Sequence, residues 1–214
     1  LISESNDCDG ILSSITDMLD ADTISKLSSK IKIISNFAVG FGNIDIIEAK
    51  KRNIVVTNTP DVLTEATAEI AMLVILGAAR RAKEGINWVN RKNWQWSADF
   101  LMGKQLTGER LGILGMGRIG RAVAERARSF GMKIHYYNRS RLDKSLEKDS
   151  IYHKSLESLL SVSDFFSINC PATKETKHII NSKTIKHFPD GAIISNSARG
   201  DMIDDDAMVE ALKN

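Results

Sequence analysis

The stretch Gly115-Met116-Gly117-Arg118-Ile119-Gly120 decides the fold of this chain, because it follows an apolar strand and opens an amphipathic helix. A Gly-x-Gly-x-x-Gly spacing in that context is typical of a dinucleotide-binding loop. The first glycine permits a tight turn, the second lets the backbone approach a pyrophosphate, and the third allows close packing of helix and strand. The N-terminus of the helix offers unpaired N–H groups to the anion. We therefore predict a pyrophosphate site at these six residues.

Strand and helix signals alternate on both sides of this loop. Apolar runs predict strands at residues 10–12, 31–35, 54–56, 111–115, 133–137, 164–169 and 192–196. Helical periods are found at residues 24–27, 44–50, 64–81, 119–130, 156–160, 182–187 and 204–213. This alternation predicts an α/β fold with parallel strands, and its second half, with four strands and helical crossovers, predicts a doubly wound sheet.

The chain divides into two predicted domains at residue 64, where Thr64 can cap the helix that follows. Residues 1–63 form a first α/β unit that ends near Pro60, and residues 64–214 contain the glycine loop. At about 150 residues per domain, a length of 214 residues corresponds to more than one domain and less than two. Because the chain begins with Leu1, we expect either a processed protein or a piece of a longer one.

Composition and charge exclude several classes of protein. The chain is 43% hydrophobic and its net charge is +2 without a long basic block, which argues against nucleic-acid binding through many phosphate contacts. The apolar run at residues 70–79 is shorter than the ~20 residues that span a bilayer. Cys8 and Cys170 lie far apart without zinc-ligand spacing, so we expect no disulfide framework, no metal site and a cytoplasmic location.

The end of the second strand after the glycine loop carries the signal for the choice of cofactor. An NAD-specific fold places an acidic residue there to accept from the ribose 2′-hydroxyl. This chain has Asn138 instead, followed by Arg139, Ser140 and Arg141, whose donors suit a 2′-phosphate. The segment favours NADP, and NAD bound without the acidic residue stays the alternative.

The chain also carries four separated motifs, which are Ser35-Asn36-Phe37-Ala38-Val39-Gly40-Phe41-Gly42-Asn43-Ile44-Asp45, Thr57-Asn58-Thr59-Pro60 with Thr64-Glu65-Ala66-Thr67-Ala68-Glu69, the glycine loop, and Ser197-Ala198-Arg199-Gly200-Asp201 with Ile203-Asp204. In this order they resemble the motifs of the D-isomer-specific 2-hydroxyacid dehydrogenases. The segments Trp94-Gln95-Trp96, Leu101-Met102-Gly103 and Leu106-Thr107-Gly108 are most similar to those of the glyoxylate/hydroxypyruvate reductases.

The resemblance implies a Rossmann-type cofactor domain inserted in a flavodoxin-like catalytic domain that is built from both ends of the chain. Residues 1–63 would then be part of the split catalytic domain, and residues 64–214 a C-terminally truncated NAD(P)-binding domain. Both domains would be incomplete here. The helix at residue 64 would be the first crossing between them, and this region contributes to a homodimer in the family.

The implied reaction is NAD(P)H-dependent reduction of a small 2-keto acid, glyoxylate or hydroxypyruvate, to the D-2-hydroxy acid. Such a reduction needs a cationic group that holds the carboxylate and polarises the keto oxygen. Arg199 fits this catalytic role, since it follows the strand at 192–196 at the carboxyl edge of the sheet and matches the family's catalytic arginine. The alternative is an ion pair with Asp201 or Asp204. The resemblance further implies that backbone N–H groups at Val39 and Gly40 bind the substrate carboxylate.

The remaining cofactor contacts are also carried over from the family. They are Thr67, Asn138, Arg139, Ser140, Cys170, Pro171, Thr176, Ser197, Ala198 and Arg199, beside the glycine loop. The family's proton donor is a histidine paired with a glutamate, both beyond Arg199. None of the four histidines, His135, His153, His178 and His187, occupies such a position, so we expect the chain as given to turn over poorly.

Two alternatives stay open at this point. Related dehydrogenases act on phosphoglycerate or lactate, and some relatives are dinucleotide-sensing corepressors that recruit partners without catalysis. Trp94 and Trp96 either anchor the helix between domains or subunits, or one of them reaches the neighbouring subunit's cleft and favours small substrates.

Overall fold

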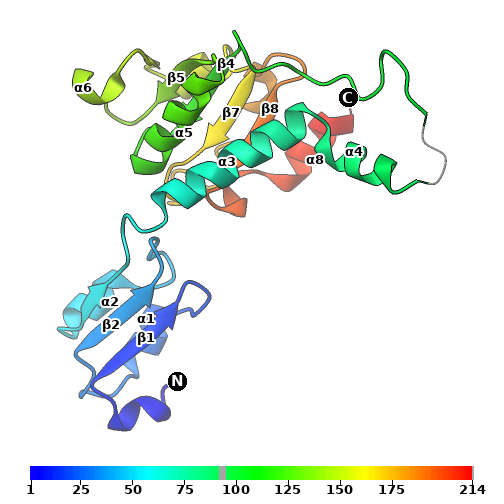
Figure 1. Cartoon of the computed structure of the whole chain (residues 1–214). Coiled ribbons are helices and arrows are strands. Elements are labelled where there is room, and N and C mark those ends of the chain that lie inside the picture. The colour runs from blue at the N-terminus through cyan, green and yellow to red at the C-terminus, as the bar shows by residue number, and fades with distance from the viewer. Residues whose placement is uncertain (92–94, 214) are drawn as a thin grey trace. The chain divides into compact units, whose positions relative to one another are not determined.

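The computed structural model of the chain describes residues 1–91 and 95–213. It separates into two compact units, Leu1–Leu63 and Thr64–Asn214, each with its own parallel sheet (Figure 1). Trp94 lies outside the described residues, and the prediction for its side chain rests on the sequence alone. Among the described residues, no helix is both long enough and apolar enough to cross a membrane.

The first unit is a three-stranded sheet with helices against one face. Its order is β1-β2-β3, and its elements are η1 (Glu4–Asp7), β1 (Gly10–Ser14), α1 (Ala21–Ser25), β2 (Ile33–Phe37), α2 (Ile46–Lys51) and β3 (Val55–Thr57). Asp20 and Asp45 cap the two helices by accepting from the N–H groups of Thr23 and Glu48. Buried aliphatic residues that include Leu19, Ile24, Ile34 and Ile54 form the core between sheet and helices.

The second unit has a five-stranded parallel sheet in the order β6-β5-β4-β7-β8. Its strands are β4 (Arg110–Leu114), β5 (Lys133–Tyr137), β6 (Ile151–Tyr152), β7 (Phe165–Ile168) and β8 (Ile193–Asn196). Its helices are α3 (Thr64–Ala79), α4 (Ala82–Val89), α5 (Arg118–Ser129), α6 (Lys144–Glu147), α7 (Leu156–Leu160) and α8 (Asp205–Lys213), with short 3₁₀ turns η2 (Ile185–His187) and η3 (Gly200–Met202). The order confirms the predicted α/β fold of Rossmann type.

Both faces of this sheet are buried, as expected for parallel strands. Figure 1 shows α3 and α5 beside one another, and they cover the face that carries Leu111, Ile113 and Phe165. Alternate strand residues, Leu114 and Phe166 among them, pack on the opposite face in a separate core with α7. Because successive side chains of a strand point to opposite faces, the near-continuous apolar run of each strand serves both layers.

Three predictions about elements were wrong. The sheet has five strands instead of four, since β6 and the short α6 before it are too brief to leave a periodic signal. The helix predicted at 182–187 is only the 3₁₀ turn η2, since the chain becomes extended at Phe188, the residue before Pro189. The helix predicted at 64–81 ends at Ala79, and Arg81 adopts a left-handed conformation before α4 begins.

Candidate functional site

The glycine loop lies where the sheet changes its winding direction. β4 pairs with β5 on one side and with β7 on the other, so the loops that leave β4 and β7 diverge at the carboxyl edge of the sheet. Ligands of open α/β sheets bind in the crevice at such a switch point. The predicted pyrophosphate loop and the predicted cofactor segment after β7 therefore meet at the same edge.

Each of the three glycines has a distinct environment. A Cβ on Gly115 would lie 2.5 Å from the backbone nitrogen of Cys170, and Gly115 has a φ of +93° that side chains disfavour. A Cβ on Gly120 would lie 2.2 Å from the carbonyl oxygen of Gly115, whereas one on Gly117 would meet nothing within 4 Å. Two glycines thus permit close backbone packing, and the middle one borders open space, as the predicted approach of a pyrophosphate requires.

The first turn of α5 presents N–H groups that no side chain caps. Gly117 is the N-cap residue and offers no capping oxygen, and the first turn contains no acidic residue. Helix N-termini with these properties attract anions through their free N–H groups and the helix dipole. The loop before the helix is tied to the end of β5, since Met116 N–H donates to Asn138 Oδ1 at 2.7 Å and Gly115 N–H to Tyr137 C=O at 3.1 Å.

The segment after β5 carries the donors that were predicted to meet the ribose. Asn138 Oδ1 accepts from Met116 N–H, and its Nδ2 group has no acceptor among the described residues. A free N–H donor suits an oxyanion better than the hydrogen of a hydroxyl group. Arg139 and Ser140 are exposed. A hydrogen bond from Thr173 and, more weakly, the charge of Arg139 lower the pKa of Glu175, so Arg139 lies near the loop that follows β7.

Arg141 was predicted to join these donors, and the structure contradicts this part of the prediction. Its guanidinium donates to both carboxylate oxygens of the buried Glu147 at 2.7 and 2.9 Å. Tyr136 Oη donates to the same carboxylate at 2.6 Å and accepts from the N–H of Leu142. The hydrogen bonds from Arg141 and Tyr136 lower the pKa of Glu147, and burial raises the pKa of Tyr136 to about 12. Arg141 therefore fixes the shape of this loop.

The segment after β7 is an ordered turn beside the glycine loop. Thr176 Oγ1 accepts from Thr173 N–H at 2.7 Å and donates to Pro171 C=O at 2.9 Å. Burial raises the pKa of the Cys170 thiol to about 11. Because a thiol with that pKa stays protonated at neutral pH, Cys170 is a packing residue and no nucleophile.

Residues 197–199 follow β8 at the same carboxyl edge. Asn196 holds them, because its Oδ1 accepts from Ala198 N–H at 3.0 Å and its Nδ2 donates to Arg199 C=O at 2.7 Å. The guanidinium of Arg199 is exposed and donates to Ala198 C=O. Among the described residues its guanidinium bonds to this carbonyl and forms no ion pair with Asp201 or Asp204, so the alternative role as an ion-pair partner is not observed. Sequence reasoning missed Asn196, whose only signal is its position at the strand end.

Two of the four histidines, His135 and His153, form a hydrogen bond with each other and not with residues 197–199. His135 Nδ1 lies 2.9 Å from His153 Nε2, and His153 Nδ1 lies 3.1 Å from Ser158 Oγ. Within residues 1–91 and 95–213, no histidine hydrogen-bonds the side chain of Arg199, and no cluster of three or more His, Cys, Asp or Glu residues could hold a metal ion. Thr67 is half-buried in the second turn of α3.

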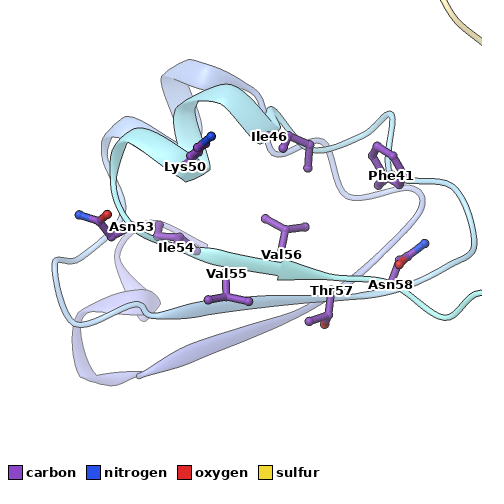
Figure 2. A pocket seen from close by; sticks show the side chains of 9 residues that line it. All are labelled: Phe41, Ile46, Lys50, Asn53, Ile54, Val55, Val56, Thr57 and Asn58. Atoms are coloured by element: carbon purple, nitrogen blue, oxygen red, sulfur yellow. The ribbon is translucent and has the colours of Figure 1, made fainter.

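The substrate residues predicted in the first unit lie in the loop after β2. Val39 C=O accepts from Asn58 Nδ2 at 2.8 Å, and Gly40 C=O accepts from Asn36 Nδ2 at 2.9 Å. A groove of about 570 Å³ runs along β3 and α2 in the same unit and has Phe41, Ile46, Lys50, Val56 and Asn58 in its lining (Figure 2). Neither Val39 nor Gly40 lines this groove.

Comparison with known proteins gives a consistent result. Residues 72–214 match the family model of the D-isomer specific 2-hydroxyacid dehydrogenase, NAD binding domain. The chain is 43% identical to the glycerate dehydrogenase of Hyphomicrobium methylovorum and 42% identical to the glyoxylate reductase of Thermococcus litoralis, all of this chain being covered in both cases. It spans 67% and 66% of the lengths of these two relatives.

A solved structure agrees with these sequence matches. The D-lactate dehydrogenase of Aquifex aeolicus, complexed with NAD and lactic acid, superposes with a TM-score of 0.91 at 34% identity. The superposition covers 99% of this chain and 62% of that one. The similarity therefore extends over both units of this chain.

Proposed function

Because the chain belongs to the D-isomer specific 2-hydroxyacid dehydrogenase family, we propose that its protein reduces a small 2-keto acid to the D-2-hydroxy acid. The nicotinamide dinucleotide supplies the hydride. Glyoxylate and hydroxypyruvate are the proposed substrates, in line with the names of the relatives. The observation that carries the proposal is an exposed arginine, held by Asn196 at the carboxyl edge of a sheet whose switch point carries an open glycine loop.

Separate groups of residues are proposed to bind the cofactor and the substrate. In the proposal, Gly115, Met116, Gly117, Arg118, Ile119 and Gly120 bind the pyrophosphate, and Cys170, Pro171, Thr176, Thr67, Ser197 and Ala198 line the rest of the dinucleotide. Arg199 polarises the keto oxygen and pairs with the carboxylate, since its planar guanidinium can donate two parallel hydrogen bonds. The N–H groups of Val39 and Gly40 are proposed to bind the substrate carboxylate. None of the four histidines of this chain is assigned the role of proton donor.

The test is steady-state kinetics of the protein expressed from its complete reading frame. We expect oxidation of NADPH or NADH in the presence of glyoxylate or hydroxypyruvate. An Arg199→Gln variant should lower kcat/KM by about 10²-fold or more, because a charge-assisted donor at the developing oxyanion is lost. A Lys177→Gln variant removes an exposed charge from another loop and should retain parental rates. Parental activity in Arg199→Gln would contradict the assignment.

We further propose a preference for NADP. It rests on the Nδ2 group of Asn138, which has no acceptor among the described residues, on the exposed Arg139 and Ser140, and on the lack of an acidic residue at the end of β5. Arg139→Ala should raise the KM for NADPH about tenfold, through loss of a charged hydrogen bond to phosphate, and leave the KM for NADH within about twofold. An equal change for both cofactors would argue that Arg139 does not meet the 2′-phosphate.

The protein is also proposed to form a homodimer through α3. This helix exposes Ile70, Leu73 and Val74, with 54%, 63% and 46% of their surfaces accessible. Contiguous apolar surface of this kind marks interaction sites. Light scattering should give a dimer for the parent and a monomer for Leu73→Glu. A monomeric parent would overturn this part.

A further inference from the structure

The loop after β2 is held by hydrogen bonds to three successive carbonyl oxygens. Thr59 N–H donates to Ala38 C=O at 2.9 Å, Asn58 Nδ2 to Val39 C=O at 2.8 Å, and Asn36 Nδ2 to Gly40 C=O at 2.9 Å. Every donor lies outside the segment whose carbonyls it holds. The orientation of each peptide plane from residue 38 to residue 41 is therefore set by an anchor.

Fixing these carbonyls also aims the N–H groups. All peptide bonds of the described residues are trans, and in a trans peptide the N–H of one residue points opposite to the C=O of the residue before it. The anchor on Ala38 C=O thus turns Val39 N–H away from Thr59, and the anchor on Val39 C=O turns Gly40 N–H away from Asn58. Neither N–H has a hydrogen-bond acceptor in the part of the chain that the structure describes.

A buried amide network prevents one of the anchors from turning. Asn36 is 2% exposed, its Oδ1 accepts from Ser13 Oγ at 3.1 Å, and its Nδ2 also lies 3.2 Å from Asn43 Oδ1. Asn43 Nδ2 in turn donates to Ser14 C=O and Asp17 C=O, each at 3.0 Å. Rotation of the Asn36 amide would leave several buried polar atoms without partners, which is unfavourable.

We propose that Asn58 is a positioning residue, which orients the N–H group of Gly40 toward the carboxylate of the substrate, while Asn36 fixes the next peptide plane, between Gly40 and Phe41. The backbone N–H of Thr59 orients Val39 N–H in the same way. The proposal deepens the proposed function and rests on it. Two preorganised N–H donors bind a carboxylate without the cost of ordering the loop at the moment of binding. Loss of an anchor would weaken substrate binding more than the chemical step, because neither side chain touches the keto carbon in this assignment.

Thr57 provides the matched control. Figure 2 shows Val56 and Asn58 on the side of the sheet that faces α2, with Val55 and Thr57 on the other side. Thr57 Oγ1 pairs with Ser35 Oγ at 3.0 Å, and within the part of the chain that the structure describes its side chain forms no hydrogen bond with the loop carbonyls. Thr57→Val therefore removes a hydrogen bond from the neighbouring position and leaves the loop anchors in place.

The first experiment compares kinetics in the protein from the complete reading frame. Asn58→Leu, which is close in size, should raise the KM for glyoxylate and hydroxypyruvate about tenfold with kcat within about threefold. Asn58→Asp, which keeps the shape and removes the donor, should act in the same direction, and Thr57→Val should match the parent. A parental KM in both Asn58 variants would overturn the proposal.

The second experiment does not depend on turnover. Oxalate, a dicarboxylate analogue of glyoxylate, is titrated into the ¹⁵N-labelled 214-residue chain, and the amide signals of Val39 and Gly40 are followed. We expect both signals to shift in the parent and in Thr57→Val, and the Gly40 signal to respond at least about tenfold more weakly in Asn58→Leu. An equal shift of the Gly40 signal in Asn58→Leu, or none in the parent, would overturn the proposal. Failure of the proposed function would be recognised separately, as shifted amides in a protein that reduces no 2-keto acid.

Discussion

The stability of the second unit should depend on pH through a pair of hydrogen-bonded histidines, the buried His135 and the half-buried His153. Ser158 Oγ donates to Ser155 C=O at 2.9 Å, so it accepts from His153 Nδ1–H. His153 Nε2 must then accept from His135 Nδ1–H across 2.9 Å, and both rings are neutral. His135 is 8% exposed, and burial together with the neighbouring His153 lowers its pKa to about 4. Burial also lowers the pKa of His153.

The size of the effect follows from linkage. His135 has an ordinary pKa of 6.5 when unfolded and about 4 when folded, so the unfolded chain binds more protons between these values. The contribution of His135 to the free energy of unfolding is therefore fully present above about pH 7 and decreases as the pH is lowered. For His135 alone, the loss between pH 7 and pH 5 is about 2 kcal/mol. The hydrogen bond from Arg110 lowers the pKa of Asp164 to about 2. The contribution of Asp164 to stability is lost only below about pH 4. It therefore does not overlap with the loss that His135 causes between pH 7 and pH 5.

The assay is urea unfolding at pH 7 and pH 5. The parent should lose about 2 kcal/mol or more over this range. The double variant His135→Leu and His153→Leu should lose less than about half of that, because replacing both partners by apolar groups leaves no buried donor unpaired. His178→Gln, at an exposed histidine, should behave as the parent. The reasoning is refuted if the double variant keeps the full pH dependence, or if the parent shows none.

Three further predictions concern the second unit. Gly120→Ala should weaken dinucleotide binding at least about tenfold by calorimetry, since its Cβ would lie 2.2 Å from Gly115 C=O, whereas Gly77→Ala, with open space around it, should bind normally. Arg141→Ala should lower the urea midpoint of unfolding, because the carboxylate of Glu147 would lose its cation and two hydrogen bonds; an unchanged urea midpoint would contradict this. Trp96→Ala should alter the ranking of kcat/KM among glyoxylate, hydroxypyruvate and pyruvate if Trp96 meets substrate, and an identical ranking would exclude that role.

The sequence predicted those parts of the fold that depend on local signals. The glycine loop, β5 and α7 are found where their patterns placed them, with bounds of 133–137 and 156–160 matched to the residue. Long apolar periods and a helix-opening glycine motif are properties of neighbouring residues, so one sequence suffices to find them. Elements of two to four residues such as β6 and α6 owe their structure to pairing with β5 and to the Glu147 network, and they leave no period to detect.

The candidate site was predictable where a motif carries the chemistry, and less so where a distant partner decides it. Arg139 and Arg141 look equivalent in the sequence. Only the structure shows that Arg141 is occupied by Glu147, six residues further along. The roles of Asn58 and Asn196 as anchors could likewise not be predicted from the sequence. An asparagine that donates to a nearby carbonyl belongs to no motif with a fixed spacing. Side-chain to backbone bonds of this kind depend on how loops meet at the sheet edge.

The most direct measurement is the handedness of the product. Hydroxypyruvate and NADPH are incubated with the protein from the complete reading frame, and the glycerate that forms is resolved by chiral chromatography. We expect D-glycerate, formed in step with NADPH oxidation and at least about 10²-fold more slowly in Arg199→Gln. L-glycerate, or no product from hydroxypyruvate or glyoxylate with either cofactor, would contradict it.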